Sequence, residues 1–219
     1  MPKADEKTWY IFGAGGFGLE VCDIVHSVLA AKEEKFKIEF LVDCPETDTL
    51  AGIRVRSLSE ATPGSSVTIA LGEPAARHAL RGRLVEKGLK LKSAISPSAF
   101  VSRSAKLGKG CIVAPLSSIQ SQAKIGVNVA VNTQAIVGHH VGVGADASIS
   151  SQVNLGGAVK IGRRTYIGMG ALLIEKSIIG SDSIIGMGSV LYKDIPNGVI
   201  AMGNPARVVR RNENKKVFK

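Results

Sequence analysis

The sequence predicts an α/β domain over residues 1–92, followed by an all-β domain over residues 93–219 in which short strands coil into a parallel β-helix. Two observations support this prediction. A glycine-rich turn stands between a predicted strand and a predicted helix near the start, and an aliphatic residue recurs at every sixth position through much of the second half. Hydrophobic residues make up 45% of the chain but aromatic residues only 5%, which suits a narrow core filled by small aliphatic side chains.

The first domain begins with an apolar run at residues 8–12, the sequence GAGGFG and an amphipathic segment over residues 19–32. A strand, a glycine turn and a helix in this order can bind phosphate, because glycine lets the backbone approach a ligand and a helix N-terminus offers free N–H donors. We therefore expect a Rossmann-like domain. At about 90 residues it is short for a complete dinucleotide fold, and a turn needed only for packing is the alternative.

Two further strands are predicted in this domain. One covers residues 38–42 and ends at Asp43, where an acidic side chain could accept a hydrogen bond from a ribose hydroxyl. The other covers residues 67–71 and precedes Gly72-Glu73-Pro74. Together with the first strand they would form a small parallel sheet.

The second domain is defined by a six-residue period. An aliphatic residue occupies every sixth position from Ile95 to Leu191, and a small or β-branched residue follows four positions after each. This period is neither that of an α-helix nor a simple strand alternation, and it indicates short strands separated by corners. The aliphatic side chains should fill the interior, while the small ones let successive coils stack at strand spacing. Glycine often follows the aliphatic residue, where we expect it to supply backbone angles that other residues resist.

Two of the four histidines are adjacent, and both fall between the inward-facing positions 137 and 141. We therefore expect His139 and His140 on the outer surface of the β-helix. Histidine is suited to accept a proton near neutral pH, which favours a catalytic role over core packing. By contrast, Cys111 occupies an inward position and Cys22 lies on the predicted helix, so neither is expected to act as a nucleophile.

The combination of GAGGFG, a strand ending in aspartate, the sequence ALGEPAAR and the hexads resembles the bacterial nucleotide-sugar acetyltransferases that make bacillosamine and perosamine derivatives, and their sialic-acid O-acetylating relatives. The resemblance covers nearly the whole chain. It implies left-handed coiling with three hexads per coil, and a homotrimer with active sites between subunits. It also implies acetyl-CoA as the acetyl donor and a nucleotide-linked amino sugar as the acceptor bound by residues 1–92.

The resemblance also assigns catalytic residues. His139 matches the family's general base, His140 is a secondary candidate, and Asn132 matches an active-site asparagine. Gly157 would donate its backbone N–H to the thioester carbonyl, where negative charge develops. Two positions depart from the family pattern: His140 stands where many relatives carry a carboxylate, and Ser148 stands where another histidine is common.

Binding residues are assigned in the same way. The sequence GNPAR resembles a family motif that lines the coenzyme A cleft, although its rigid residues could equally serve only to end the coil. It supplies the cofactor-binding candidates Gly203, Pro205 and Arg207. The glycine turn and the end of the second strand supply the nucleotide-binding candidates Gly13, Gly15, Gly16 and Asp43.

Composition and spacing limit the other possibilities. The three cysteines lack disulfide or metal spacing, and no metal site is expected. The net charge of +10 is scattered without aromatic platforms, so it predicts attraction of phosphate-rich small molecules and not nucleic-acid binding. No long apolar run or leader is present, which predicts a cytoplasmic protein without membrane partners. N-acetylation of a nucleotide-linked amino sugar, foremost a 4-amino-dideoxy sugar, is the leading function. O-acetylation of a sugar of the sialic-acid type and a non-catalytic β-helix scaffold are the alternatives.

Overall fold

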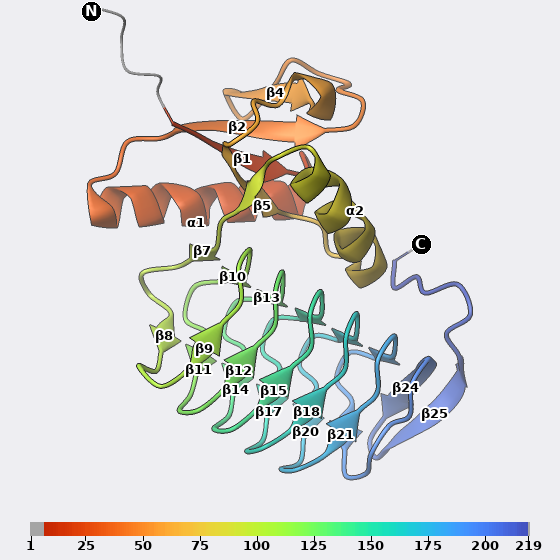
Figure 1. The fold of residues 1–219 in the computed structure, drawn as a ribbon. Coiled ribbons are helices and arrows are strands. Elements are labelled where there is room, and N and C mark those ends of the chain that lie inside the picture. The colour runs from red at the N-terminus through yellow and green to blue at the C-terminus, as the bar shows by residue number, and fades with distance from the viewer. Residues whose placement is uncertain (1–6, 219) are drawn as a thin grey trace, which may run out of the picture.

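The computed structural model describes residues 7–218, and its first part is a six-stranded sheet with a helix on each face (Figure 1). The strand order is β3-β4-β2-β1-β5-β6, with only β3 and β4 antiparallel. The strands are β1 (Thr8–Phe12), β2 (Lys37–Val42), β3 (Thr49–Leu50), β4 (Ile53–Ser57), β5 (Ser66–Ile69) and β6 (Lys90–Leu91). The helices are α1 (Gly16–Lys32), a 3₁₀ turn (Leu58–Glu60) and α2 (Pro74–Glu86).

The three predicted strands are present, with small differences at their ends. The first helix starts at Gly16, three residues before the predicted position, because the glycine turn is itself the first helical turn. The strand predicted over residues 67–71 ends at Ile69. Sequence patterns did not indicate β3, β4, β6 or α2; α2 in particular has few apolar positions, although Pro74 opens it in the manner typical of helix N-termini.

Strand β1 is buried on both faces, as a central parallel strand requires. Trp9 and Ile11 pack with the apolar side of α1, whereas Tyr10 and Phe12 pack in a second cluster with α2 residues such as Leu80. The two helices therefore cover opposite faces of the sheet.

The second part is a parallel β-helix of two-residue strands, and this prediction is confirmed. Each strand pairs in parallel with the strand 18 residues further on, for example Ile112 with Ala94 and Ala130 with Ile112, so one coil contains three hexads. The first face contains β7 (Ala94–Ile95), β10 (Ile112–Val113), β13 (Ala130–Val131), β16 (Ser148–Ile149), β19 (Tyr166–Ile167) and β22 (Ile184–Ile185). The second face contains β8 (Phe100–Val101), β11 (Ser118–Ile119), β14 (Ile136–Val137), β17 (Asn154–Leu155), β20 (Leu172–Leu173) and β23 (Val190–Leu191). The third face contains β9 (Lys106–Leu107), β12 (Lys124–Ile125), β15 (Gly142–Val143), β18 (Lys160–Ile161) and β21 (Ile178–Ile179).

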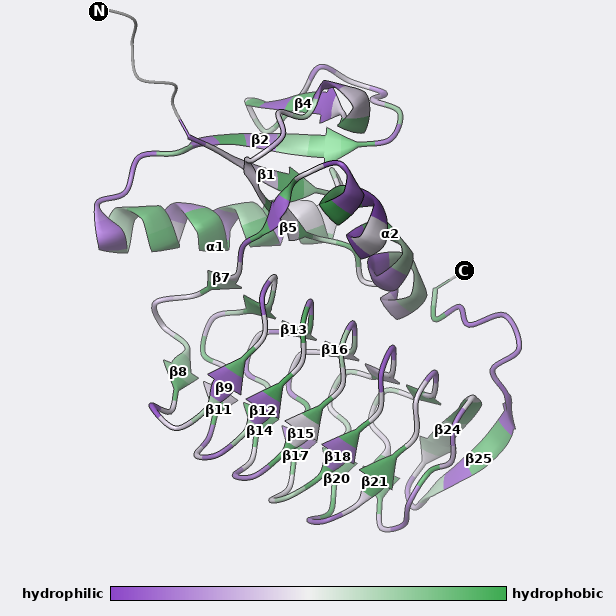
Figure 2. Cartoon of the chain, viewed as in Figure 1, coloured by the Kyte–Doolittle hydropathy of each residue, from purple (hydrophilic) through white to green (hydrophobic). Residues whose placement is uncertain are grey.

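The second residue of each short strand points inward. These aliphatic side chains form one continuous core with the small residues at the corners. Figure 2 shows the result on the third face, where hydrophilic and hydrophobic residues alternate within single strands such as β9, β12 and β18. After β23 the coil ends in a hairpin of β24 (Val199–Gly203), which is parallel to β22, and β25 (Ala206–Arg211).

The glycines that follow the aliphatic residues have a different cause from the one predicted. Gly126 and Gly144 do not adopt positive φ; a Cβ on either would lie 2.6 Å from a backbone nitrogen of the next coil. They are therefore needed for close stacking. Positive φ occurs two residues later in each hexad, at positions such as Asn128 and His140.

The N-terminal part sits on the first face of the coil, as Figure 1 shows. Apolar residues of α1 share one buried cluster with Ala94, Ile112 and Ala130 of that face. A polar cluster lies beside them, where α2 meets the corner between the third and first faces: Arg77 contacts Asn128, and both His78 and Arg81 contact Asp146.

Candidate active site and acceptor cleft

The two adjacent histidines lie exposed at the corner between the second and third faces. Nδ1 of His139 and Nδ1 of His140 are 3.0 Å apart. A hydrogen bond between them requires one of these nitrogens to carry the proton and the other to accept it. The rings stand nearly perpendicular, at 87°. His140 thus occupies one ring nitrogen of His139 and leaves Nε2 of His139 for other contacts.

The ring of His139 lies against the backbone of Gly157 in the next coil. A Cβ on Gly157 would lie 2.6 Å from both Cε1 and Nε2 of that ring, so only glycine accommodates this position of His139. The carbonyl of His139 accepts a hydrogen bond of 2.8 Å from the Ala158 N–H. Among residues 7–218 the Gly157 N–H donates to no backbone carbonyl or side chain, which leaves it available to a bound molecule.

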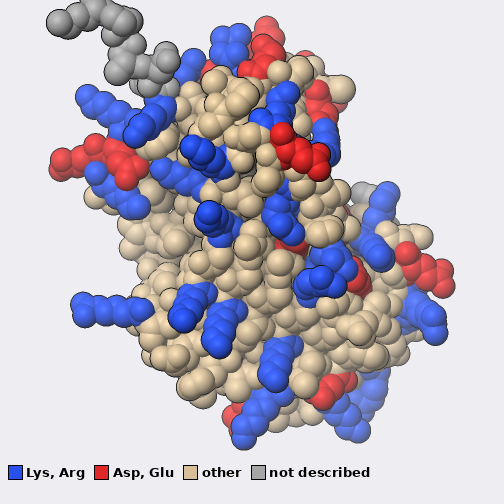
Figure 3. Space-filling view, viewed as in Figure 1, with Lys and Arg blue, Asp and Glu red and all other residues tan. Residues whose placement is uncertain are grey.

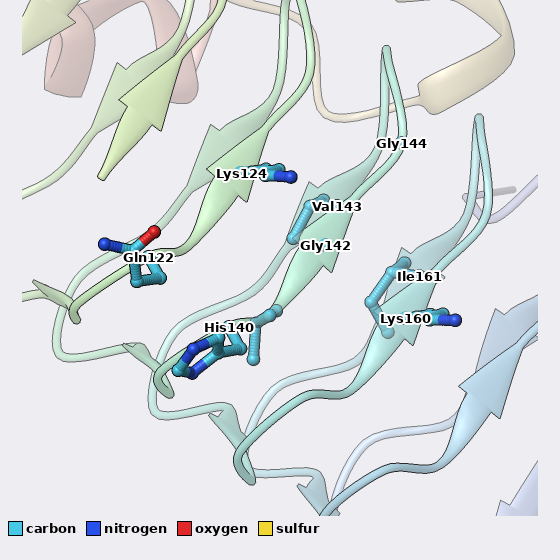
Figure 4. Close-up of a pocket in the computed structure, with 9 residues that line it drawn as sticks. Gln122, Lys124, His140, Gly142, Val143, Gly144, Lys160 and Ile161 are labelled. Atoms are coloured by element: carbon cyan, nitrogen blue, oxygen red, sulfur yellow. The ribbon is translucent and has the colours of Figure 1, made fainter. Parts of the chain in front are cut away.

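A hollow of about 500 Å³ opens on the third face beside His140 (Figure 4). Lys124 and Lys160 flank it from β12 and β18, and Gly142 on the strand between them leaves the gap. Figure 3 shows Lys and Arg side chains spread over this view of the molecule, with fewer Asp and Glu side chains. Two lysines therefore line the same hollow as His140.

A second opening, which we call the acceptor cleft after the ligand that we propose for it, lies between the glycine turn and the first face and has a volume of about 240 Å³. It is lined by Phe17, Glu20, Gly72, Ala130, Asn132, Ser148, Ser150, Ser151, Tyr166 and Phe218. Oδ1 of Asn132 is buried there without a hydrogen-bond partner among the described residues. Because buried polar atoms are normally paired, this oxygen is suited to a donor group on a bound molecule.

Ser148 has a structural contact. Its hydroxyl donates a 3.1 Å hydrogen bond to the carbonyl of Gly72, and so ties the first face to the turn before α2.

The three glycines predicted to bind the nucleotide differ from one another. Gly13 has φ of 120°, and a Cβ there would lie 2.6 Å from the carbonyl oxygen of Ala70. Packing alone therefore explains why position 13 is a glycine. Gly15 and Gly16 meet no atom within 4 Å of a Cβ, and Gly15 precedes α1 without a side-chain cap. Packing gives no reason for glycine at these two positions, and both stand at a helix N-terminus, where N–H donors are free.

Asp43 already has a partner within the chain. Its carboxylate accepts two hydrogen bonds from Arg83, at 2.5 and 3.2 Å, and these bonds hold the pKa of Asp43 below its usual value. Sequence reasoning did not foresee this pair because α2, which carries Arg83, was not predicted.

The GNPAR sequence forms the turn between β24 and β25. The Asn204–Pro205 peptide bond is cis, and the Gly203 N–H donates to the Ser189 hydroxyl at 3.2 Å. Arg207 is exposed at the start of β25. This turn closes the C-terminal end of the coil.

Two of the three thiols are poorly suited to act as nucleophiles. Cys22 and Cys111 are buried, and burial raises the pKa of Cys22 to about 11 and also raises that of Cys111. Among residues 7–218, no group of three His, Cys, Asp or Glu side chains could hold a metal ion.

One chain does not bring the predicted catalytic residues together. Asn132 follows β13 at the edge of the first face and lines the acceptor cleft, whereas His139 follows β14 at the far edge of the second face. The whole of the second face lies between them. A site that contains all three of His139, His140 and Asn132 would therefore need residues from two subunits, as the expectation of active sites between subunits requires.

Sequence reasoning also missed a row of polar residues at the corner between the third and first faces. Asn128, Asp146, Arg164 and Asp182 occupy the same position in successive coils, and the first two of them contact α2. Polar residues that recur every 18 positions at one corner could have indicated that this corner contacts another part of the protein.

Comparison with known proteins defines the family. A model of the bacterial transferase hexapeptide (six repeats) matches residues 158–193. The acetyltransferase domain of PglB from Neisseria gonorrhoeae, solved with acetyl coenzyme A, is 30% identical; the match covers 93% of this chain and 100% of that chain with a TM-score of 0.87. The chain belongs to the hexapeptide-repeat nucleotide-sugar acetyltransferases. It is therefore an acyltransferase, and the alternative of a non-catalytic scaffold is set aside.

Other relatives of this acetyltransferase agree. PerB from Caulobacter crescentus, solved with CoA and GDP-perosamine, is 28% identical over 92% of this chain and 97% of that chain, with a TM-score of 0.82. WeeI from Acinetobacter baumannii is also 28% identical, over 93% and 100%, with a TM-score of 0.74. No match was found among curated protein sequences. Within residues 7–218 the acetyltransferase has no helix that is both long and apolar enough to cross a membrane.

Proposed function

We propose that this acetyltransferase transfers the acetyl group of acetyl-CoA to the amino group of a nucleotide-linked sugar, foremost a 4-amino-dideoxy sugar. The ring of His139 lying on the backbone of Gly157 is the observation that carries the proposal, because it joins a proton acceptor to a free N–H donor. The full-length similarity to PglB and PerB supports the same donor and the same class of acceptor.

The proposed reaction is direct transfer. The amine nitrogen attacks the thioester carbon, a C–N bond forms, and Nε2 of His139 takes the amine proton. The Gly157 N–H donates to the carbonyl oxygen as negative charge develops on it. The C–S bond then breaks, and the leaving thiolate recovers the proton from the imidazolium of His139. His140 holds the ring of His139 through Nδ1, where many relatives use a carboxylate.

We further propose that the protein acts as a homotrimer with composite sites. Outward positions of the second face carry mainly apolar side chains, whereas those of the third face carry mainly lysines. Phe100, Ile136 and Leu172 on the second face are 62%, 38% and 47% exposed. Exposed apolar surface of this kind marks an interface, and a second copy packed there would add another subunit's surface to the corner that carries His139.

The two parts of the chain have separate tasks in this proposal. Residues 1–92, as a Rossmann-like domain, bind the nucleotide through Gly15 and Gly16 at the start of α1, with Gly13 and Asp43 as supporting residues. Residues 93–219, as a left-handed β-helix, bind acetyl-CoA, with Gly203, Pro205 and Arg207 near its distal end. Both substrates are cytoplasmic metabolites, so the proposal places the enzyme in the cytoplasm.

An acetylation assay tests the proposal. Purified protein is incubated with acetyl-CoA and a panel of UDP-, GDP- and dTDP-linked amino sugars, and products are identified by mass spectrometry. An amide product, stable to hydroxylamine, is expected. A product that hydroxylamine cleaves would indicate O-acetylation instead, and absence of any acetylated product across the panel would contradict the proposal.

A further inference from the structure

The C-terminal segment returns to the acceptor cleft. After β25 ends at Arg211, the chain turns back along the coil toward α2, as Figure 1 shows. Asn212 secures this turn, because its N–H donates to the carbonyl of Gly198 and its side-chain amide donates to the carbonyl of Asp182, each at 2.8 Å. The segment from Asn212 to Phe218 therefore follows a defined path.

The end of this segment is held by one carboxylate. Oε2 of Glu73 accepts hydrogen bonds from the backbone N–H groups of Val217, at 2.8 Å, and Phe218, at 3.3 Å. Hydrogen bonds to an ionised acceptor are stronger than neutral ones. Glu73 belongs to the turn that precedes α2, next to Gly72, whose carbonyl accepts from Ser148. The first face, the turn and the C-terminal segment thus meet at one point.

The ring of Phe218 packs at the mouth of the cleft. It meets the ring of Tyr166 edge to face, with centroids 5.5 Å apart and an interplanar angle of 84°. A Cβ on Gly72 would lie 3.0 Å from the Phe218 ring, so any other residue at position 72 would require this ring to shift. Despite these contacts, Phe218 is 51% exposed and lines the cleft together with Phe17 and Asn132.

We propose that the C-terminal segment is the outer wall of the acceptor cleft and that Phe218 is a specificity-determining residue that contacts the nucleotide-linked sugar. The proposal rests on the function proposed above. Aromatic rings of Phe17, Tyr166 and Phe218 stand in the same cleft as the hydroxyls of Ser148, Ser150 and Ser151 and the amide of Asn132. A cleft with aromatic surfaces and a few polar groups fits a ring that has apolar faces and polar edges, such as a sugar or a nucleobase.

The wall is assigned to the acceptor and not to acetyl-CoA because of where the cleft lies. Phe17 and Glu20, at the start of α1, line the cleft beside the glycine turn to which nucleotide binding is assigned, whereas the residues assigned to acetyl-CoA lie elsewhere on the coil. Loss of the Phe218 ring should therefore affect the acceptor and leave the donor unchanged.

Steady-state kinetics of Phe218→Ala test the proposal. With the nucleotide-linked amino sugar that the wild type acetylates, we expect a roughly five- to tenfold rise in acceptor KM, the size of a lost aromatic contact, with kcat and acetyl-CoA KM within about twofold. Phe218→Tyr should restore the acceptor KM. Val85→Ala is the control for surface truncation, because Val85 on α2 is a half-exposed apolar residue like Phe218. It should leave the acceptor KM and the acetyl-CoA KM unchanged.

Each outcome is decisive. An unchanged acceptor KM, or an equal change in acetyl-CoA KM, would overturn the proposal. A lower acceptor KM would also overturn it, because it would show that the segment blocks the cleft. A wild type that acetylates no member of the panel refutes the proposed function and this proposal with it, whereas an active wild type with an indifferent Phe218→Ala refutes this proposal alone.

Hydrogen exchange tests the anchoring of the segment without reference to activity. The amides of Val217 and Phe218 should be protected in the wild type, lose protection in Glu73→Ala, and retain it in Glu73→Gln, which keeps an acceptor oxygen. The acceptor KM should rise in Glu73→Ala, where the amides lose protection from exchange, and should stay unchanged in Glu73→Gln, where they keep it. Fast exchange at both amides in the wild type would show that the wall is not formed.

Discussion

Arg77 and Asn128 bind each other in both directions across the junction between the sheet domain and the coil. Nη2 of Arg77 donates to Oδ1 of Asn128 at 2.9 Å, Nε donates to the Asn128 carbonyl at 3.2 Å, and the Asn128 amide returns a 3.3 Å bond to the Arg77 carbonyl. Arg77 is 0% exposed, and its remaining donor group, Nη1, serves the carbonyls of Ile69 and Leu71. Burial lowers the pKa of Arg77 to about 10, so the guanidinium stays charged at neutral pH.

Arg77→Ala should destabilise the protein by about 3 kcal/mol or more, because several buried acceptors lose their donors at once. Arg77→Lys should recover little of this loss, since one ammonium cannot reproduce the planar fork that reaches both Ile69 and Asn128. Urea unfolding at fixed protein concentration measures both effects. A loss below about 1 kcal/mol for Arg77→Ala would show that water replaces the guanidinium.

The stability of the junction should depend on acid pH through Asp146. Burial alone would raise the pKa of Asp146, but hydrogen bonds from Arg81, Asn128 and His78 hold it below its ordinary 3.8. A carboxyl with a lowered folded-state pKa stabilises the fold above pH 3.8, and this contribution is lost as the pH falls through the folded-state pKa. The free energy of unfolding should therefore fall on acidification below about pH 4.

Asp146→Asn removes this contribution and should cost about 2 kcal/mol at neutral pH, with a flatter acid dependence than the wild type. Urea unfolding of both proteins between pH 3 and pH 7 provides the measurement. Parallel curves for the two proteins would contradict the assignment of the acid dependence to Asp146.

The glycines of the first turn should separate into two classes. Gly13→Ala should prevent stable folding or cost several kcal/mol, because its Cβ would meet the Ala70 carbonyl at 2.6 Å in a backbone region unfavourable to alanine. Gly15→Ala should leave the melting temperature nearly unchanged, since its Cβ meets open space, while raising KM for the nucleotide-linked sugar. Thermal melting and steady-state kinetics test the pair. A rise in acetyl-CoA KM alone for Gly15→Ala would reverse the ligand assignment.

His139→Ala should lower kcat about a hundred- to ten-thousandfold near neutral pH, the usual contribution of a positioned base, with KM values little changed. His140→Ala should cost less, because it removes only the group that orients the His139 ring through the 3.0 Å Nδ1 contact. His140→Asp, which supplies the carboxylate of many relatives, should retain most of the activity.

One result would contradict the roles assigned to the two histidines. If His139→Ala turns over normally while His140→Ala is inactive, the roles of the two histidines are reversed. Alkaline buffers are avoided in this assay because a deprotonated amine needs no base.

Sedimentation of the wild type should give a mass about three times 22.9 kDa. Leu172→Lys places a charge on the apolar second face and should dissociate the trimer and reduce activity with it, because the proposed site spans two subunits. Lys160→Ala on the third face is the matched control and should leave the assembly intact. A fully active monomer would contradict the composite site.

The β-helix could be predicted from sequence alone because each hexad repeats the same local requirement. Ile125 must fill the interior, Ala123 and Val129 must fit a corner, and Gly126 must let the next coil approach, so these requirements are visible every six residues. The same count placed the adjacent histidines on the outer surface, and the structure shows both exposed.

Tertiary structure decided everything that depends on residues far apart in the chain. No local sequence pattern indicates the hydrogen bonds between Arg77 and Asn128 or the ion pair between Asp43 and Arg83. The same holds for the separation of Asn132 from His139 and for the contact of Phe218 with Gly72. A repeat is readable because it constrains neighbours along the chain, whereas these contacts join single residues whose partners are chosen only when α2, the coil and the C-terminal segment pack together.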